Sequence, residues 1–426
     1  MSSEAQPGRG LAAILPSKLF YGWVIAAIAF AAQFVFTASG LSIIGNLVTP
    51  VSKEFDVAPT LVGIAPGLAI LVMGILGPFI GRAIDAGHVR RVMVVGGVLS
   101  GLGLMAISQA STFWQVGLAF LLLCAPGFAL FGTLPVMALV ANWFVRRRGL
   151  VLGVAVAGAT FASGVGPNLF EEIVADHGWR TALLSFGAFT AAVSLPLFGG
   201  FIVSRPEELG LRPDGAAAPV ASESPEEAGP RARTAAELAK MPALWIQAIG
   251  FGLVLTSPVV IIALLVPFGE ALGLSRDEAS DFFLWMIPFS LAGKLVIGGL
   301  ADVTPLKPGI ALMVVVNAIV WWMLQQEPDY DRLMVIGAIY GLGIGGMAPL
   351  HGVLIGRLFG RIDFGTASGL GGIVGVGLIV LASFGSQGLL AATGSYPLVC
   401  TVQMVLVLLG GALLAFLRIP SADQAR

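Results

Sequence analysis

The chain has 426 residues, of which 57% are hydrophobic and only 11% are charged. Soluble domains carry about 25% charged residues, so this composition excludes a soluble enzyme and indicates a polytopic membrane protein. The formal net charge is −1, and no patch of mixed basic and aromatic residues favours a nucleic-acid partner. We expect the lipid bilayer to surround most of the chain, and we expect neither a metal nor a cofactor.

Twelve apolar spans follow one another, each long enough to cross a bilayer. Lipid offers the backbone no other hydrogen-bond partner, so the predicted fold is all-α with twelve transmembrane helices. The spans are placed at residues 20–48, 60–82, 91–110, 113–141, 149–174, 179–203, 242–268, 279–301, 308–326, 332–357, 364–391 and 396–418.

The lysines and arginines indicate the orientation of these spans. With the N-terminus in the cytoplasm, 18 of the 23 fall on the cytoplasmic side, four fall outside and Lys294 falls within a span. By the positive-inside rule, this bias predicts cytoplasmic tails at residues 1–19 and 419–426. We expect a multi-pass protein of a bacterial-type inner (plasma) membrane with both termini cytoplasmic.

The longest polar segment, residues 204–241, divides the spans into six and six. It is rich in Ala, Pro, Glu and Ser, a composition typical of disordered segments. We interpret it as a cytoplasmic linker between an N-terminal six-helix bundle at residues 20–203 and a C-terminal six-helix bundle at residues 242–418.

The two halves carry an internal repeat. Gly81 and Asp85 end the second span, and Gly298 and Asp302 end the eighth, 217 residues later in both cases. Glycines near the start of the fifth and eleventh spans also correspond: Gly149 and Gly153 in the first half, Gly365 and Gly369 in the second. Duplicated six-helix halves are characteristic of one large class of transporters. The repeat therefore predicts two pseudo-symmetric bundles.

One cation lies deep inside a span. Lys294 precedes Asp302 by eight residues, which places it about 12 Å from the span end along a helix. A lysine at this depth costs about 2.5–3.5 kcal/mol on insertion scales and marks a functional site. No carboxylate is predicted at mid-membrane, so a ligand carboxylate is a natural partner. The alternative is a lysine that extends to the headgroups or loses its proton.

The loop after the second span resembles the signature of the major facilitator superfamily, G-x3-D-(R/K)-x-G-x-R-R. The matching residues are Gly81, Asp85, Arg90 and Arg91, whereas Ala86 and His88 depart from the pattern. The second copy keeps Gly298, Asp302 and Lys307 but has Val303 and Pro305. The resemblance implies the major facilitator fold and a conformational gate at these positions. In the family the aspartate is thought to pair with the loop arginines, here Arg146, Arg147 and Arg148.

A narrower resemblance is to the monocarboxylate and oxalate–formate branch. It rests on Tyr21-Gly-Trp23, on Asn142-Trp-Phe-Val-Arg-Arg-Arg-Gly149 and on Arg205-Pro-Glu-Glu-Leu-Gly210. That branch has a cation in span 8 that contacts the substrate carboxylate, and Lys294 falls on this position. Other cations or carboxylates of the branch are replaced by Leu41, Ser290 and Gly371. The resemblance thus implies an anion site but not its usual coupling residues.

Three further residues are candidates for substrate contact. His351 lies at a depth similar to that of Lys294, and it can bind substrate, carry a proton or simply pack. Gln33 and Asn168 are amides in spans that line the cavity in this family, although such amides more often join helices.

The leading interpretation is a secondary active transporter of a small organic anion, a monocarboxylate, that works by alternating access as a monomer. A coupled proton or a counter-substrate remains open. One alternative is an exporter of neutral or lipophilic compounds in which Lys294 is structural. A membrane enzyme would need clustered His, Asp or Glu at membrane depth, so it is a remote alternative, as is a sensor.

Overall fold

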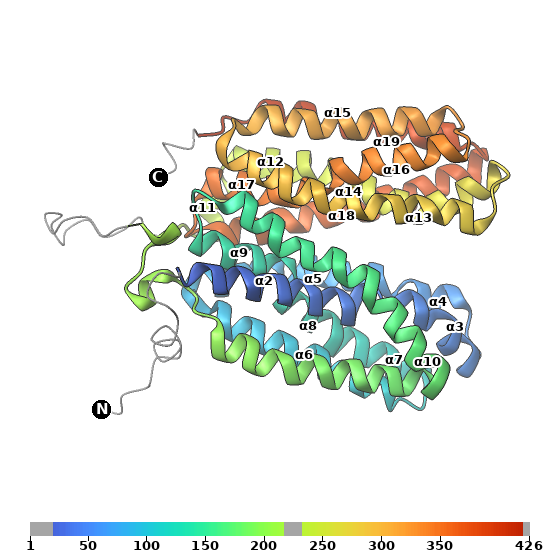
Figure 1. The fold of residues 1–426 in the computed structure, drawn as a ribbon, viewed down its shortest axis with the longest axis horizontal. Helices are drawn as coiled ribbons and strands as arrows, with labels where there is room; N and C mark the ends of the chain where they lie inside the picture. The colour runs from blue at the N-terminus through green and yellow to red at the C-terminus, as the bar shows by residue number, and fades with distance from the viewer. Residues whose placement is uncertain (1–19, 217–231, 421–426) are drawn as a thin grey trace, which may run out of the picture. The chain divides into compact units, whose positions relative to one another are not determined.

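The structure is a computed structural model that describes residues 20–216 and 232–420. Within these ranges every regular element is a helix and no strand occurs (Figure 1). The all-α expectation is therefore confirmed. Most of the predicted tails (residues 1–19 and 421–426) and the middle of the predicted linker (217–231) lie outside the described residues.

The helices of the first half include three short π-type turns and two 3-10 turns, which carry η labels. They are α2 (Gly22–Phe36), η1 (Thr37–Leu41), α3 (Ile44–Glu54), α4 (Pro59–Gly63), α5 (Ala65–Ala83), η2 (Ile84–His88), α6 (Val89–Ser108), α7 (Phe113–Ala119), η3 (Phe120–Cys124), α8 (Ala125–Phe131), α9 (Thr133–Trp143), α10 (Arg148–Phe201), η4 (Pro206–Leu209) and η5 (Pro213–Gly215).

The second half is built from α-helices alone among its described residues. They are α11 (Ala235–Ala239), α12 (Pro242–Val254), α13 (Thr256–Ala271), α14 (Arg276–Val303), α15 (Leu306–Gln325), α16 (Tyr330–Gly345), α17 (Met347–Phe359), α18 (Phe364–Thr393) and α19 (Tyr396–Ala415).

Ten helical stretches in the described residues are long and apolar enough to cross a membrane. Two of them exceed what one crossing needs, because Pro59–Ser108 has 50 residues and Arg148–Phe201 has 54. Each is interrupted at a glycine with positive φ, Gly87 at 88° and Gly178 at 81°. A side chain disfavours that backbone region, so glycine permits the break. Ten stretches, two of them double, account for the twelve predicted spans.

The described residues form two compact units. Unit 1 takes in residues 20–146, 155–216, 232–234 and 361–369, and unit 2 takes in residues 147–154, 235–360 and 370–420. The first turns of α18 thus belong to unit 1, and the first turns of α10 belong to unit 2. The expected bundle boundaries at 20–203 and 242–418 stay a prediction.

Several helices begin at side chains that accept hydrogen bonds from their first turn. Ser275 and Glu278 form a reciprocal capping box at the start of α14. Asp329 caps α16 and Ser395 caps α19 by accepting from the amides of Arg332 and Leu398, without the reciprocal bond. Such caps satisfy amide groups that have no partner within the helix, and they fix where the membrane-crossing helices start.

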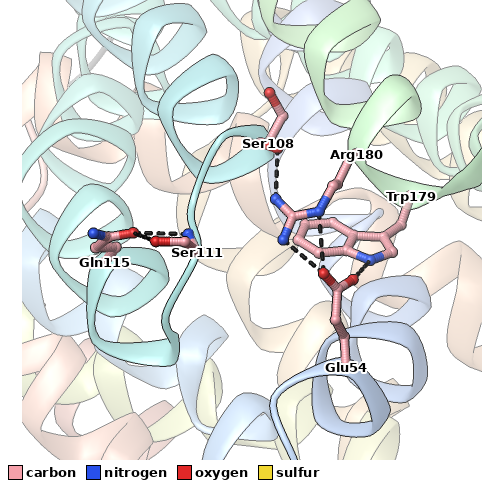
Figure 2. Close-up of polar contacts among 6 residues, drawn as sticks. All are labelled: Glu54, Ser108, Ser111, Gln115, Trp179 and Arg180. Atoms are coloured by element: carbon pink, nitrogen blue, oxygen red, sulfur yellow. Dashed lines mark hydrogen bonds and ion pairs between the residues drawn. The ribbon is translucent and has the colours of Figure 1, made fainter.

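At one end of unit 1, a cluster of polar side chains joins three helices. The carboxylate of Glu54 in α3 accepts hydrogen bonds from the Trp179 indole at 2.6 Å and from Arg180 Nη2 at 2.7 Å. Arg180 Nη1 also donates to the Ser108 carbonyl at the end of α6, at 2.7 Å. Figure 2 shows these side chains converging, with Ser111 and Gln115 paired beside them. The cluster fixes the ends of α3, α6 and the second part of α10.

At the other end of unit 1, Tyr21 and Trp143, from two of the motifs that carry the monocarboxylate resemblance, pack together against the segment just before the third motif. The rings of Tyr21 and Trp143 are 5.6 Å apart. Trp143 Nε1 donates to the Val203 carbonyl at 2.9 Å, and Asn142 donates to the Ser204 carbonyl at 3.2 Å. Segments distant in sequence therefore form one packed layer at this end.

In unit 2, α14 and α16 pack closely along a row of glycines. The contacts are Gly337 against Phe282, Gly341 against Met286 and Gly345 against Ser290. A side-chain carbon on any of these glycines would lie 2.2–2.8 Å from the facing carbonyl oxygen, so only glycine allows this approach. The glycine-rich run at residues 341–346 is therefore a helix-packing surface that fixes the position of α14.

Candidate functional site

Lys294 is buried in unit 2, on α14, with 9% of its surface exposed. Its ammonium nitrogen Nζ donates a hydrogen bond to Ser290 Oγ one turn earlier, at 2.8 Å. No carboxylate forms an ion pair with it among the described residues. The ammonium keeps two further N–H donors and Ser290 keeps its O–H, so the pair offers three donors to an anion.

Two glycines fix the backbone at Lys294. A side-chain carbon on Gly153 of α10 would lie 2.1 Å from the Lys294 carbonyl oxygen, and one on Gly345 of α16 would lie 3.0 Å from its amide nitrogen. Both neighbouring helices therefore approach α14 at the residue that carries the cation. A position fixed in this way suits a binding group, because binding then costs little ordering of the protein.

His351 in α17 is partly buried, and it contacts α12. Its Nε2 lies 3.2 Å from Gln247 Oε1, and its ring stacks on Phe251 with centroids 4.5 Å apart. If Nε2 carries the proton, Nδ1 is left as an acceptor. Lys294 and His351 lie in the same unit, but no hydrogen bond joins them among the described contacts.

Gln33 and Asn168 belong to unit 1. Gln33 is 1% exposed, and its amide Nε2 has no hydrogen-bond partner among the described residues. Asn168 is exposed, and its amide donates to the Gly164 carbonyl of its own helix at 2.9 Å. Gln33 thus keeps an unused donor, whereas Asn168 is turned back onto α10.

The predicted gating aspartate has partners other than those that the resemblance implied. Asp85 accepts hydrogen bonds from the backbone amides of Gly365 at 2.8 Å and Thr366 at 2.7 Å, the first turn of α18. In the described structure Asp85 thus pairs with a helix N-terminus, and its implied pairing with Arg146, Arg147 and Arg148 stays a prediction. The partial positive charge of that terminus and two N–H donors suit a carboxylate as well as an arginine does.

Asp302 makes the corresponding contact in unit 2. Its two carboxylate oxygens accept from the amides of Gly149 at 2.6 Å and Leu150 at 2.9 Å, which start α10. The glycines one turn before each aspartate allow the helices to cross. A side-chain carbon added to Gly81 would lie 2.0 Å from the Gly365 carbonyl oxygen. One added to Gly298 would lie 2.6 Å from the Gly149 carbonyl oxygen.

The arginines predicted to gate differ in burial. Arg91, Arg146 and Arg147 are exposed, and Arg90 is intermediate. Arg148 is only 5% exposed, and its guanidinium lies against Gly356 of α17, where an added side-chain carbon would displace it. Arg148 is thus the member of this set that packs inside unit 2.

Sequence reasoning missed Gln247 as a site residue. It is 1% exposed, it contacts His351, and its Nε2 lies 2.7 Å from where a side chain on Gly371 would begin. The resemblance to the monocarboxylate and oxalate–formate branch implied a charged side chain where this chain has Gly371, and Gln247 occupies the space that such a side chain would take. The sequence signal that could have identified Gln247 was a polar glutamine within the apolar span at residues 242–268.

Comparison with known proteins identifies the family of the chain. Residues 23–324 match the model of the Major Facilitator Superfamily. The chain belongs to this family. The family consists of transporters of small molecules and not of enzymes, so the chain is a multi-pass membrane transporter.

Two curated relatives and one solved structure are similar to this transporter. An MFS-type transporter of Gibberella moniliformis is 24% identical, with 80% of this chain and 78% of the relative covered. Human monocarboxylate transporter 11 is 28% identical, with 95% and 78% covered. The E. coli fucose:proton symporter matches with a TM-score of 0.70 at 11% identity, over 93% of this chain and 99% of that one. The chain thus has the major facilitator fold and resembles the monocarboxylate branch.

Proposed function

We propose that this transporter moves a small organic anion with one carboxylate group, and that Lys294 pairs with that carboxylate. The observation that carries the proposal is a buried ammonium hydrogen-bonded to Ser290, with no carboxylate paired to it among the described residues. One cation matches one carboxylate, whereas a second carboxylate would remain unpaired. The names of monocarboxylate transporter relatives point to the same substrate class.

The mechanism follows from the cost of an isolated buried charge. Without substrate, Lys294 has a neutral hydroxyl as its partner, and a substrate carboxylate that enters supplies the missing negative charge. Charge-assisted hydrogen bonds of this kind contribute about 1.5–3 kcal/mol, or roughly 10–150-fold in affinity. The neutralised pair is then less costly to enclose, so bound substrate favours the change between the two access states.

The orientation of the chain in the membrane is part of the same proposal. The 18-to-4 bias of cations supports cytoplasmic termini in an inner membrane of bacterial type. Substrate then reaches Lys294 from one side of the membrane at a time, as alternating access requires.

The test is carboxylate uptake into proteoliposomes by Lys294 variants. Lys294→Ala should abolish uptake while the protein still folds, and Lys294→Arg should keep part of it, because the charge survives in a different geometry. Carboxylates should raise the melting temperature of the parent protein but not of Lys294→Gln, because ligand binding stabilises the native state.

Lys240→Gln is the matched control, since it removes an exposed lysine of the same unit and should transport normally. If Lys294→Gln takes up and binds carboxylates like the parent, the lysine is structural. An exporter of neutral or lipophilic compounds would then be the better description.

A further inference from the structure

Two adjoining cavities lie at one end of unit 2. The first borders Asp302, which is about 12 Å along α14 from Lys294. The first has a volume of about 400 Å³, within the range of small-molecule sites. It is formed where α14 ends and α15 begins, and Lys307 and Arg357 line it together with Asp302. The substrate site proposed above does not use Lys307 or Arg357.

The first cavity favours an anion. Lys307 Nζ donates one hydrogen bond, to the Ala415 carbonyl at 3.1 Å, and Arg357 Nη2 donates to the Ala301 carbonyl at 2.8 Å. Both cations therefore keep further N–H donors. Asp302 is the one carboxylate in the lining, and both of its oxygens already accept hydrogen bonds from the start of α10. The lining of the first cavity therefore has more free N–H donors than free acceptors, which favours a bound anion.

The second cavity, of about 250 Å³, is an apolar groove between α15 and α19. Its floor is made of small residues, Ala311 on α15 and Gly411 and Ala415 on α19, with Leu414 beside them. Lys307 lines both cavities, so the groove begins where the cationic cavity ends. Both helices are apolar enough to cross a membrane, and the groove lies along the first turns of α15 and the last turns of α19. An acyl chain that enters at this end would run along the apolar part of both helices.

We propose that these two cavities together bind one anionic phospholipid. Its phosphate is held by Lys307 and Arg357, and one acyl chain follows the groove past Ala311. A soluble anion would use the first cavity but gain nothing from the second. Basic pockets next to membrane-crossing helices are known to hold anionic headgroups, and exposed apolar residues such as Val303 and Phe416 surround this end of the unit.

The proposal is tested by titrating the purified full chain with lipids and counting bound molecules by native mass spectrometry. Dioleoylphosphatidylglycerol should bind more tightly than dioleoylphosphatidylcholine, which has no net charge. Lys307→Gln should weaken binding of the anionic lipid about fivefold and leave the zwitterionic lipid unchanged. Ala311→Trp fills the groove without changing charge, and it should also weaken binding of the anionic lipid. Lys240→Gln is the matched control and should bind both lipids like the parent.

Two results would overturn the proposal. Equal binding of the two lipids by the parent protein would exclude a headgroup site, and this comparison needs no variant to fold. The second result has two parts. Glycerol 1-phosphate would bind to the parent but not to Lys307→Gln, and Ala311→Trp would bind the anionic lipid as tightly as the parent does. That result would show a site for a soluble anion. Neither readout involves substrate, so the lipid proposal stands or fails separately from the role of Lys294.

Discussion

Asp85 and Asp302 hold the corresponding ends of the two units, with nearly the same local geometry. Each accepts two backbone hydrogen bonds of 2.6–2.9 Å from the first turn of a helix that starts elsewhere in the chain. Each follows a glycine that allows a close helix crossing. The two sequence repeats therefore make the same aspartate hydrogen bonds and the same glycine helix crossing in both units.

The surroundings of the two aspartates differ. Near Asp85, side chains of the predicted linker bind the same region: Arg205 donates to the Asp85 carbonyl, and Glu207 pairs with Arg361. Arg233 pairs with Asp363, just before α18. The described parts of the linker, residues 204–216 and 232–241, are thus structural and not only a connection.

Near Asp302, the neighbouring charges come from the spans themselves. Arg357 of α17 donates to the Ala301 carbonyl, and the buried Arg148 packs on Gly356. The cavity with Lys307 also borders Asp302. We infer that both units share a close helix crossing held by an aspartate carboxylate. Contacts from the linker strengthen this crossing in unit 1, and the buried Arg148 strengthens it in unit 2.

The largest effects should come from filling the helix crossings themselves. Gly153→Ala and Gly369→Ala are equivalent in the repeat, and the added carbon would lie 2.1 Å from the Lys294 carbonyl and 2.2 Å from the Gly77 carbonyl. Overpacking of this kind costs about 1–3 kcal/mol, so both variants should melt at lower temperature. Gly153→Ala should also weaken carboxylate binding, because it displaces Lys294.

Gly164→Ala in α10 and Gly375→Ala in α18 are the matched controls. A side-chain carbon at either position meets nothing within 4 Å, so both should be neutral or slightly stabilising, since alanine favours helices. If Gly153→Ala and Gly164→Ala melted alike, the close crossing would not matter for stability.

The next largest effect should come from neutralising the two aspartates. Asparagine keeps one carbonyl acceptor, so the substitution exchanges charged hydrogen bonds for a neutral one at a cost of about 1 kcal/mol. Asp302→Asn should therefore favour conformations in which the ends of α14 and α10 separate. Asp85→Asn should have a smaller effect on α5 and α18, because the linker ion pairs of Glu207 and Arg233 do not involve Asp85 and remain. In Asp302→Asn, by contrast, Arg148 and Arg357 lose the negative charge that attracts them. Spin-label distance distributions across each crossing measure both effects.

Carboxylate affinity within one conformation should change little in either aspartate variant, because neither aspartate contacts Lys294 in the described structure. A larger shift in Asp85→Asn than in Asp302→Asn would contradict the reinforcing role of the linker.

Much of this arrangement could be predicted from the sequence. The apolar runs predicted the spans, since lipid enforces helices on them. The spacing of Gly81 to Asp85 and of Gly298 to Asp302 predicted the repeat. Lys294 stood out because a cation in an apolar run has a high cost.

The partners of these residues could not be predicted in the same way. Asp85 and Asp302 accept hydrogen bonds from backbone amides. Almost every residue type has such an amide, so the sequence does not identify these partners. Gln247 is one amide among several in apolar spans, so its contact with His351 depends on how α12 packs on α17. The order in the linker depends on tertiary contacts of Arg205 and Glu207, which composition does not reveal.

The smallest expected effect concerns the ion pair between Glu207 and Arg361. Their side chains are 45% and 34% exposed, so solvent screens the pair and we expect about 0.2–1 kcal/mol. Glu207→Gln alone should scarcely change the distance distribution across α5 and α18. In the Asp85→Asn background it should increase the shift toward that of Asp302→Asn, because the linker then provides the remaining restraint. High salt should reproduce this increase, since it screens exposed charges. Arg332→Gln is the control, because its pair with Asp329 is more exposed, at 73% and 70%, and belongs to unit 2. If Glu207→Gln and Arg332→Gln had the same effect in the Asp85→Asn background, the linker would not reinforce unit 1, and the difference between the two aspartates would need another cause.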